Sequence, residues 1–516
     1  MKKERETLSM GSLIECAGGE FAKIEDPKPR SGFSIKDCLL SGLGMFYLKM
    51  PSMLQFVNGV TDKNNVLVQN LVNLYGIDSV PSDTTLRLRL DEIKPGKRFQ
   101  YVFDGLISKL QRGKLLEDFR YYEDYYLVAI DGTGYFSSSD IRCDNCCIKE
   151  HKDGSVSYYH QALSAVMVCP GIKEVLPLGI EPIIKQDGSV KNDCEINAAK
   201  RLLQNIRTSH PNLNIILLLD ALYANGPLIR LMQELNFRYI ITGKNLNHMY
   251  DEFKNNGKAV TYEIKNIVQE QKYRFANELE LNATHPDIKV NYVEYNELTH
   301  KKKFKVREMI SEPTDDRFPR RTDVVVYNGE VYFKHKESGK LTKLVLPNFD
   351  KEVILRNVKK YINSITDDSI VSQGVDSPAK NFYSSWITDL ELSKENIQFI
   401  IVAGRARWCI ENETFNTLKN LGYNFEHNYG HGYNNLSVVL CHLMFIAFAI
   451  DQIQAYCSYY FKQALKVVSA KKYIWERIRP VFTMIAVTSW EEFYDAVINF
   501  NLYCGKIAVA QYPPTQ

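Results

Sequence analysis

The sequence predicts an α/β protein with a mixed β-sheet flanked by helices, interrupted by a β-rich insertion, with helical N- and C-terminal regions. Three observations support this class. Apolar residues recur at helical spacing over residues 1–120 and again over 426–516. Residues 121–243 begin with short apolar runs typical of strands, which then alternate with amphipathic helical segments. Residues 244–392 consist mainly of strand-like alternating segments, and a block this long is not expected to be an unstructured loop.

The composition is that of an ordinary globular protein. The 516 residues are 45% hydrophobic and 24% charged, with a formal net charge of +3. The N-terminus lacks the apolar segment of a secretory signal, and the longest apolar stretch, residues 436–450, is shorter than the roughly 20 residues that span a bilayer. We therefore expect a core helix there and no membrane partner. Eleven scattered cysteines favour a reducing compartment, so we expect a cytoplasmic protein.

The N-terminal region, residues 1–120, is predicted to be mostly helical. One helix is expected over residues 33–56, where Ser34 and Asp37 resemble a capping box. A short helix is expected from Pro81 to residue 90, and another over residues 99–115.

A change of period near residue 124 marks the first part of the central sheet, residues 121–243. Its expected elements are strands over residues 125–131, 157–168 and 174–184, a helix capped by Asp193, a strand over 214–219, a helix over 228–235 and a strand over 237–242. The order β-β-β-α-β-α-β is that of the ribonuclease H-like arrangement, in which the first and fourth strands are neighbours. Asp131 and Asp220 are predicted to end these two strands.

Three further parts complete the predicted organisation. Residues 244–392 form the β-rich insertion, with strands expected over residues 260–264, 273–281, 290–295, 324–333 and 341–346. Residues 393–425 return to the core as a helix that begins at Ser393, although residues 397–402 taken alone would also suit a strand. The C-terminal region, residues 426–516, is expected to be helical over residues 434–466, 476–487 and 490–500.

Two carboxylates at neighbouring strand ends are typical of divalent-metal sites. Phosphoryl transfer with such metals normally needs a third acid, so we expect Asp131, Asp220 and Glu411 to bind Mg²⁺ or Mn²⁺. Arg407 lies one helical turn before Glu411 and Lys419 two turns after it, where both cations can hold the backbone of a nucleic acid. A surface salt bridge is the alternative for Arg407 and Glu411, because such pairs are common on exposed helices.

Basic residues are clustered despite the small net charge. The clusters are Lys301, Lys302, Lys303, Lys305 and Arg307; Arg317, Arg320 and Arg321; and Lys471, Lys472, Arg477 and Arg479. Such clusters can bind phosphates through counterion release, although each one by itself also suits a solvated loop or helix face. Lys244, directly after a predicted strand, is a further candidate contact with DNA.

Three short segments resemble the acidic motifs of bacterial insertion-sequence DDE transposases. They are residues 129–133 (AIDGT), 219–225 (LDALYAN) and 407–411 (RWCIE). Within that superfamily the chain resembles the group whose last motif is Tyr-x2-Arg-x3-Glu-x6-Lys and which carries a β-rich insertion before this motif. The resemblance spans roughly residues 30–500. The motif tyrosine would fall at Gly404, and its lysine at Leu418, one place before Lys419.

The resemblance implies a transposase that cleaves the ends of an insertion sequence and joins the 3′ ends to target DNA. Asp131, Asp220 and Glu411 would bind two Mg²⁺ ions, and Arg407 and Lys419 would contact phosphates. The partners would be double-stranded DNA, recognised by residues 1–120, and a second copy of the chain in a nucleoid-associated complex, with residues 436–465 as interface material. The alternatives are a metal-dependent DNA nuclease without strand transfer and a non-catalytic DNA-binding descendant.

A cysteine-rich segment is a separate candidate metal site. Cys143 and Cys146 form a Cys-x2-Cys pair, and with His151 and His160 they can supply four ligands to a structural Zn²⁺. Free thiols and unrelated histidines are the alternative, because no second Cys-x2-Cys pair is present. For His427 and His431, we expect a contact with DNA or a role in loop structure rather than metal binding.

Overall fold

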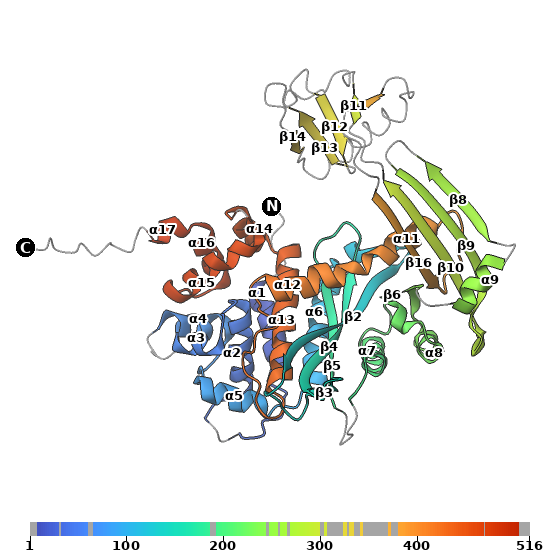
Figure 1. The fold of residues 1–516 in the computed structure, drawn as a ribbon. Helices are drawn as coiled ribbons and strands as arrows, with labels where there is room; N and C mark the ends of the chain where they lie inside the picture. The colour runs from blue at the N-terminus through green and yellow to red at the C-terminus, as the bar shows by residue number, and fades with distance from the viewer. Residues whose placement is uncertain are drawn as a thin grey trace, which may run out of the picture. The chain divides into compact units, whose positions relative to one another are not determined.

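A computed structural model of the chain divides into two compact units (Figure 1). The first comprises Met1–Asn256, Asn277–Tyr292 and Trp386–Gln516, and the second comprises Gly257–Ala276 and Val293–Ser385. The structure describes residues 8–29, 32–59, 65–185, 192–243, 247–255, 259–265, 269–299, 304–306, 323–327, 330–334, 341–343, 370–372, 380–468 and 470–504.

The N-terminal part of the first unit is helical, as predicted. Its helices are α1 (Met10–Phe21), α2 (Ile35–Tyr47), α3 (Met53–Asn58), α4 (Val66–Tyr75), α5 (Asp83–Asp91) and α6 (Lys97–Arg112). Ser34 caps α2, because its Oγ accepts a hydrogen bond from the Asp37 N–H at 3.0 Å. The prediction of one continuous helix over residues 33–56 is wrong. The chain breaks between α2 and α3, where Lys49 has a φ of 53° and Pro51 has no N–H to donate.

The sheet of the first unit brings together the strands predicted to be neighbours. Its strands are β1 (Arg120–Tyr122), β2 (Tyr125–Ser138), β3 (Cys147–Glu150), β4 (Val156–Val168), β5 (Leu176–Ile183), β6 (Ile215–Leu219), β7 (Arg238–Thr242), parts of β9 (Gln269–Asn282) and β10 (His285–Thr299), and the end of β16 (Lys380–Thr388). The order runs β3-β4-β2-β6-β7-β16, with β5 also paired to β4. β2 pairs in parallel with β6 and antiparallel with β4, so the expected adjacency of the first and fourth predicted strands is confirmed.

β2 continues well past Asp131, so the prediction that the strand ends there is wrong. Asp131 pairs with Ser164 of β4, and the pairing continues through Ser138, which is opposite Tyr158. The glycines after Asp131 do not end the strand, because β4 offers a hydrogen-bonding partner along the whole length and the ladder absorbs an irregularity after Gly134. Asp131 therefore lies inside a strand.

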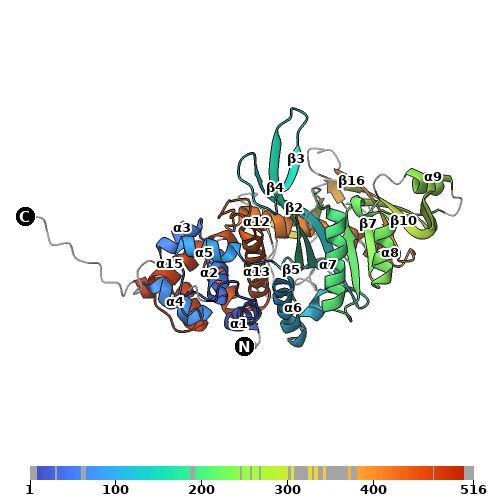
Figure 2. The ribbon, with the colours of Figure 1, turned by 90° about the horizontal axis from the view of Figure 1, so that it is seen from below.

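Helices α7 (Glu195–Ser209) and α8 (Gly226–Glu234) lie side by side along this sheet (Figure 2). α7 contacts β4 and β5, which its buried apolar face covers. The residue at its N-cap is Cys194 rather than the predicted Asp193, whose carboxylate instead accepts from the Arg201 guanidinium at 2.8 Å. The Asn225 side chain caps α8 by accepting from the Leu228 N–H at 3.1 Å.

The segment that carries the third acid is helical but not uniform. α11 (Ile397–Ala406) is followed by a π-helical segment (Ile410–Phe415) and by α12 (Asn416–Asn420). The helix reading of residues 397–402 is confirmed. Glu411 lies in the π-helical segment, and such insertions occur frequently at functional sites.

The remaining helices of the first unit are α9 (Asn247–Asn255), α13 (Leu436–Cys457), α14 (Tyr459–Lys466), α15 (Ile474–Met484), α16 (Trp490–Ile498) and α17 (Phe500–Cys504). α13 is long and apolar enough to cross a membrane by length and composition alone. Its apolar window is entirely buried, and it contacts α2, α5 and α6, so it is a core helix as predicted. The expectation that residues 436–465 offer interface material to a second copy stays a prediction, and the burial of α13 leaves α14 as the more accessible part of this segment.

The second unit is rich in β-strands, as predicted. Its strands are β8 (Val260–Lys265), parts of β9 (Gln269–Asn282) and β10 (His285–Thr299), β11 (Phe304–Val306), β12 (Asp323–Tyr327), β13 (Glu330–Lys334), β14 (Leu341–Lys343), β15 (Ile370–Ser372) and part of β16. The strand predicted over residues 324–333 is a hairpin of β12 and β13. Lys244 and, among the basic clusters, Lys301, Lys302, Lys303, Arg307, Arg317, Arg320 and Arg321 lie outside the described residues.

Asp91 at the end of α5 binds the backbone segment that leads into α13. Its carboxylate accepts hydrogen bonds from the N–H groups of residues 433, 434, 435 and 436 at 2.9–3.0 Å. Burial raises the pKa of Asp91, but these four N–H groups lower it more, and the net shift is downward. The carboxylate thus satisfies N–H groups that a helix leaves without partners at its start.

Replacing Asp91 by alanine is expected to lower the free energy of unfolding by about 3 kcal/mol, because several buried N–H groups lose their acceptor. A lowered carboxyl pKa stabilises the fold above the unfolded-state pKa, and this contribution is lost as the pH falls through the folded-state value. The deficit should therefore shrink in acid, as urea unfolding at several pH values can measure. A deficit below about 0.5 kcal/mol at pH 7, typical of surface substitutions, would contradict this role.

Candidate functional site

Arg407 joins two of the three predicted acids. Its Nη1 donates to Oδ2 of Asp131 at 2.9 Å, and its Nη2 donates to Oε1 of Glu411 at 3.1 Å. The Arg407 side chain is only 10% exposed, so the alternative of an exposed surface pair does not describe it. A guanidinium can bond two carboxylates at once because its N–H groups form a rigid planar fork. Residues that are far apart in the sequence therefore meet at one point.

Asp220 follows the end of β6, as predicted, and the strand register places it level with Asp131. Ala129 of β2 is paired with Leu218 of β6, so two further steps along both parallel strands lead to Asp131 and Asp220. The Asp220 side chain is half-buried, and no hydrogen bond or ion pair from another described residue reaches its carboxylate. Asp220 is thus a carboxylate with its oxygens free, next to the strand that carries Asp131.

Burial is the main influence on the ionisation of Asp131. Removal from water raises the pKa of its carboxyl to about 6, while Arg407 and the Gly132 N–H, at 2.9 Å, act in the opposite direction. The negative charge of Glu411 adds to the rise. One arginine is therefore not enough to compensate the buried charge of Asp131, and an additional cation near it would favour the ionised form.

A fourth acid, Glu195, approaches the same region and was not foreseen from the sequence. A Cβ atom built on Gly132 would lie 2.6 Å from Oε1 of Glu195, so the absence of a side chain at Gly132 makes room for this carboxylate. Glu195 also accepts a hydrogen bond from the Tyr223 hydroxyl at 3.0 Å. The sequence signal for Glu195 is its place in the first turn of the helix predicted after Asp193.

Gly404, where the motif of the resembled family would place a tyrosine, lies against an indole ring. A Cβ atom at Gly404 would lie 2.5 Å from Nε1 of Trp386, so the indole of Trp386 fills the place of a side chain there. Lys419, the other shifted motif position, lies on α12, and its Nζ pairs with Oε1 of Glu426 at 2.7 Å. Lys419 does not join the group around Arg407 among the contacts of the described residues.

The acids are hard oxygen donors of the kind that Mg²⁺ and Mn²⁺ prefer. Asp131 comes from β2, Asp220 from the end of β6, and Glu411 from the π-helical segment. Within the described residues, however, the acids are not a group whose ligand atoms all lie within 4.8 Å of one another. The group that meets this condition is a different one, formed by cysteines and histidines.

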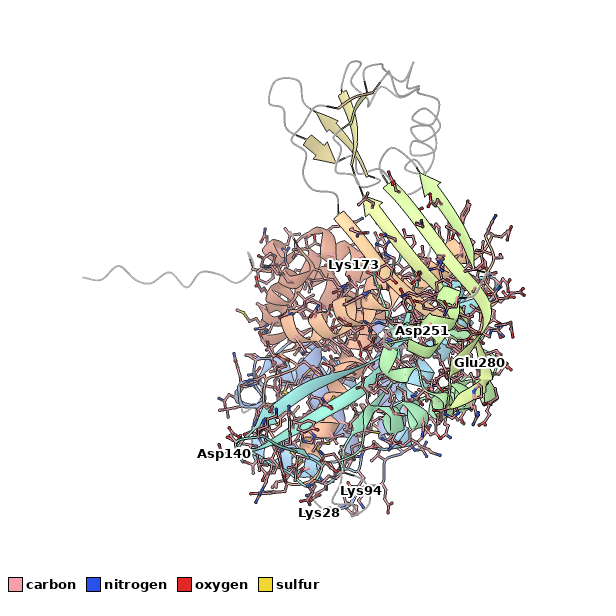
Figure 3. All side chains as sticks on the ribbon, turned by 45° about the vertical axis from the view of Figure 1, so that its right-hand side comes forward. Lys28, Lys94, Asp140, Lys173, Asp251 and Glu280 are labelled. Carbon is pink, nitrogen blue, oxygen red and sulfur yellow. The ribbon has the colours of Figure 1, made fainter. Side chains whose placement is uncertain are left out.

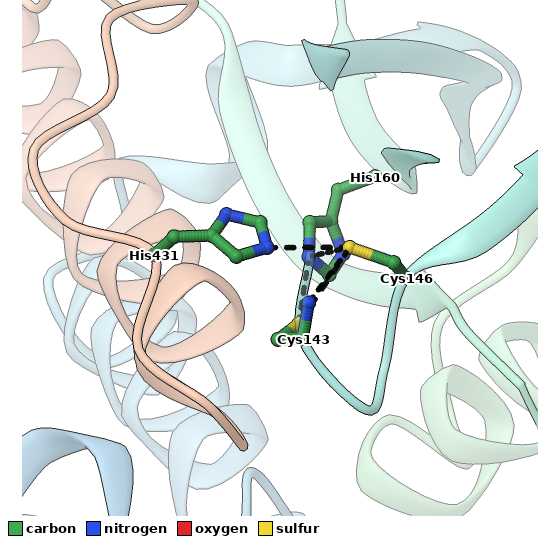
Figure 4. A group of neighbouring side chains, drawn as sticks. All are labelled: Cys143, Cys146, His160 and His431. Atoms are coloured by element: carbon green, nitrogen blue, oxygen red, sulfur yellow. Dashed lines mark hydrogen bonds between the residues drawn. The ribbon is translucent and has the colours of Figure 1, made fainter. Parts of the chain in front are cut away.

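Cys143, Cys146, His160 and His431 form this Cys–His cluster and could hold a metal ion (Figure 4). Of the four predicted ligands, the structure brings Cys143, Cys146 and His160 together and leaves His151 outside the group. His151 is exposed and its Nε2 contacts Oγ of Ser157 at 2.5 Å, whereas His431 takes the fourth place. Spacing along the chain could not identify His431, which arrives from the connection between α12 and α13.

The two thiols of the Cys–His cluster do not share the same environment. The Cys146 thiol has a lowered pKa, because Cys143 and the ring nitrogens of His160 and His431 form hydrogen bonds with its sulfur. The hydrogen bond with Cys146 and burial raise the pKa of Cys143. The neighbouring Cys147 points elsewhere, since its Sγ donates to the Ile183 carbonyl at 3.4 Å.

One predicted basic cluster, at residues 471–479, lies among the described residues. Lys472 is exposed, and Lys471 is half-buried, with a pKa lowered by burial and by the nearby charge of Lys173. Lys173 is itself exposed and is labelled in Figure 3. Arg479 instead donates from Nε to the Leu48 carbonyl at 3.3 Å. Lys173 thus lies near Lys471, but the negative charges of Glu174 and Asp451 also act on Lys471 and oppose its effect. Arg479 contacts the backbone of its own chain.

Comparison of the chain with protein-family models and with curated proteins finds no match.

Proposed function

We propose that the protein is a DDE transposase that cleaves the ends of an insertion sequence and joins the 3′ ends to target DNA. The observation that carries the proposal is the bridge from Arg407 to both Asp131 and Glu411, with Asp220 level with Asp131 on the paired strand. These are the three acids of the family motifs, contributed by two parallel neighbouring strands and a later helical segment. The strand order β5-β4-β2-β6-β7 also supports a ribonuclease H-like core.

Asp131, Asp220 and Glu411 would hold Mg²⁺ or Mn²⁺. The donor set fits, because all three are carboxylates, the Asp220 oxygens have no partner among the described residues, and the burial of Asp131 is not fully compensated by Arg407. When bound, the metal would supply Lewis-acid activation of a water or 3′-hydroxyl and stabilisation of the leaving oxygen.

The side chains of the chain itself would orient and balance charge. Arg407 fixes Asp131 and Glu411 relative to each other and neutralises part of their charge, which keeps two acids close without strong repulsion. Burial of Asp131 removes water from one side of the site and strengthens its interactions with cations. For Arg407, a positioning role is therefore better supported than a free phosphate contact; Lys419 and Lys244 remain candidate DNA contacts.

The partners follow from the same proposal. Double-stranded DNA with the inverted repeats of the element would be the substrate, and residues 1–120 would contribute to recognition of the ends. A homodimer would hold two ends together in the cytoplasm, at the nucleoid. The exposed lysines at 173 and 472 are candidates for contacts with the DNA backbone, which would make binding weaker at higher salt concentration.

Cleavage of the DNA that flanks the coding region tests the proposed function. A plasmid carrying the short inverted repeats that bracket this gene is incubated with the full-length protein and Mg²⁺. We expect breaks at the repeat ends and joined products, with both lost in Asp131→Asn, Asp220→Asn and Glu411→Gln. Asp124→Asn and Glu413→Gln are matched controls, because they neutralise acids of the β1–β2 turn and of the π-helical segment outside the triad.

Each outcome has a distinct meaning. Cleavage that continues at full rate in Asp131→Asn would overturn the assignment of the triad. Cleavage without joined products would favour the metal-dependent nuclease, and specific DNA binding without any cleavage would favour the non-catalytic descendant.

A further inference from the structure

We propose that Cys143, Cys146, His160 and His431 bind one structural zinc ion, which fastens the β2–β3 connection and β4 to the connection between α12 and α13. The proposal is independent of the reaction that the acids perform. It differs from the expectation drawn from the sequence in its fourth ligand, and this ligand changes what the metal does. With His151 the metal would stiffen one loop, whereas with His431 it joins two distant parts of the chain.

The distances between the four ligand atoms fit a tetrahedral zinc site. Zinc bonds of about 2.3 Å to sulfur and about 2.0 Å to nitrogen would place the two sulfurs about 3.8 Å apart and each sulfur about 3.5 Å from each nitrogen. The Sγ atoms of Cys143 and Cys146 are 3.7 Å apart. Nε2 of His160 lies 3.3 Å from Sγ of Cys143 and 3.4 Å from Sγ of Cys146, and Nε2 of His431 lies 3.2 Å from Sγ of Cys146.

The donor types favour zinc over the metals expected at the acids. Two sulfurs and two imidazole nitrogens suit a soft or borderline cation, whereas Mg²⁺ prefers oxygen. Four protein ligands would leave no open position for water or substrate, which is the property of a structural site. His160 is fully buried and Cys146 and His431 nearly so, which also protects the Cys146 thiol from solvent. Binding would release the thiol protons, since cysteine binds metal as the thiolate.

Two glycines flank His431 and fix its backbone position. Gly430 has a φ of 148° and Gly432 a φ of 67°, both in the region that favours glycine. A Cβ atom at Gly430 would lie 2.0 Å from Nη1 of Arg87, and one at Gly432 would lie 2.2 Å from Oδ1 of Asp91. His431 is therefore held between two glycines whose close contacts exclude a side chain, so its approach to the cysteines is determined by the surrounding packing.

Direct hydrogen bonds join the same two segments beside the Cys–His cluster. The Asp144 N–H donates to the Tyr433 carbonyl at 2.9 Å, and Nδ2 of Asn145 donates to the Asn434 carbonyl at 2.7 Å. On the strand side, His160 of β4 is paired with Phe136 of β2, the strand that carries Asp131. A metal at the Cys–His cluster would thus lock the β2–β3 connection and β4, the antiparallel neighbour of β2, to the α12–α13 connection.

Metal analysis of the full-length protein, purified without added metal or chelator, tests the proposal. We expect one zinc ion per chain by elemental mass spectrometry. The metal should be lost in Cys146→Ser and His431→Gln, and retained in His151→Gln and His427→Gln. His427 is the matched control, because it lies in the same connection but outside the Cys–His cluster.

A second measurement does not depend on the folding of any variant. X-ray absorption at the zinc edge of the unmodified protein should show two sulfur ligands at about 2.3 Å and two nitrogen ligands at about 2.0 Å. His431→Cys should keep the metal and change this to three sulfurs and one nitrogen. Full zinc content in His431→Gln, loss of zinc in His151→Gln, or a folded metal-free protein whose Cys143 and Cys146 react as free thiols or form a disulfide would overturn the proposal.

Discussion

Replacing Asp131 by asparagine is expected to abolish DNA cleavage and, at the same time, to make the protein more stable at pH 7. The loss of activity should be about a thousandfold or more, because a carboxylate of the proposed metal site disappears. The gain in stability follows from burial, which raises the pKa of Asp131 from 3.8 to about 6. At neutral pH the carboxyl must therefore ionise in the folded state at a free-energy cost that asparagine does not have.

The pH dependence gives this prediction its sign. Between about pH 4 and 6 the folded state holds a proton that the unfolded state has released, so the contribution of Asp131 to stability falls as the pH rises through this window. At pH 7 the penalty is on the order of 1–3 kcal/mol. Urea unfolding should show Asp131→Asn as the more stable protein at pH 7, with the difference vanishing near pH 4.

The exposed Asp124, whose side chain is 74% exposed, offers the control, since Asp124→Asn should leave stability within about 0.5 kcal/mol at both pH values. If Asp131→Asn were less stable than the unmodified protein at pH 7, the ion pair with Arg407 would outweigh the cost of burial, contrary to the prediction.

Breaking the buried pair of Lys49 and Asp451 is expected to cost about 3–5 kcal/mol of folding free energy. Both side chains are 1% exposed, and Nζ of Lys49 lies 2.5 Å from Oδ2 of Asp451. The ammonium also lies 3.6 Å from the ring centroid of Tyr423, whose hydroxyl bonds the same carboxylate. Asp451→Asn would leave the Lys49 charge buried without a counter-charge. Urea unfolding of this variant measures the loss.

The size of this loss should depend on pH. Burial lowers the pKa of Lys49 from 10.5 to about 8, although Asp451 acts in the opposite direction. Between about pH 8 and 10.5 the unfolded chain holds a proton that the folded protein has released, so stability rises with pH there. Without Asp451 the pKa of Lys49 in the folded protein falls further, so the deficit of Asp451→Asn should shrink as the pH rises toward about 8 and stay level above it.

A double substitution separates pairing from burial. Lys49→Met combined with Asp451→Asn removes both charges, so it should be more stable than Asp451→Asn alone. If the losses of the two single variants simply add in the double variant, the two residues do not stabilise the fold as a pair.

Much of the fold could be predicted because it depends on local patterns. Apolar spacing located α2, α6 and α7, and the order of strands was enough to expect β2 beside β6. The same local reasoning failed where pairing with a distant strand determined how far an element extends. Glycines after Asp131 are read as a strand end, but the ladder with β4 continues through them. Pro51 interrupts the helix predicted over residues 33–56.

The site divides in the same way. Asp131, Asp220, Glu411 and Arg407 could be named from short motifs, because each motif contains its own acid or cation. Glu195 could not be named in this way. It approaches the acids only because Gly132 has no side chain in its path and because the Tyr223 hydroxyl donates a hydrogen bond to it. The glycine at position 404, where the resembled motif has a tyrosine, is likewise explained only by the tertiary structure. The indole of Trp386 occupies the space that a side chain at this position would need.

By itself the sequence determined the α/β class, the three acids and the Cys-x2-Cys pair, because periodicity and short motifs are properties of neighbouring residues. The tertiary structure decided which distant side chains meet: Arg407 with Asp131, and His431 rather than His151 with the cysteines. The physical reason is that such meetings depend on strand register and on how a connection such as residues 421–435 packs back on the sheet. These long-range contacts leave no regular trace in the spacing of residues along the chain.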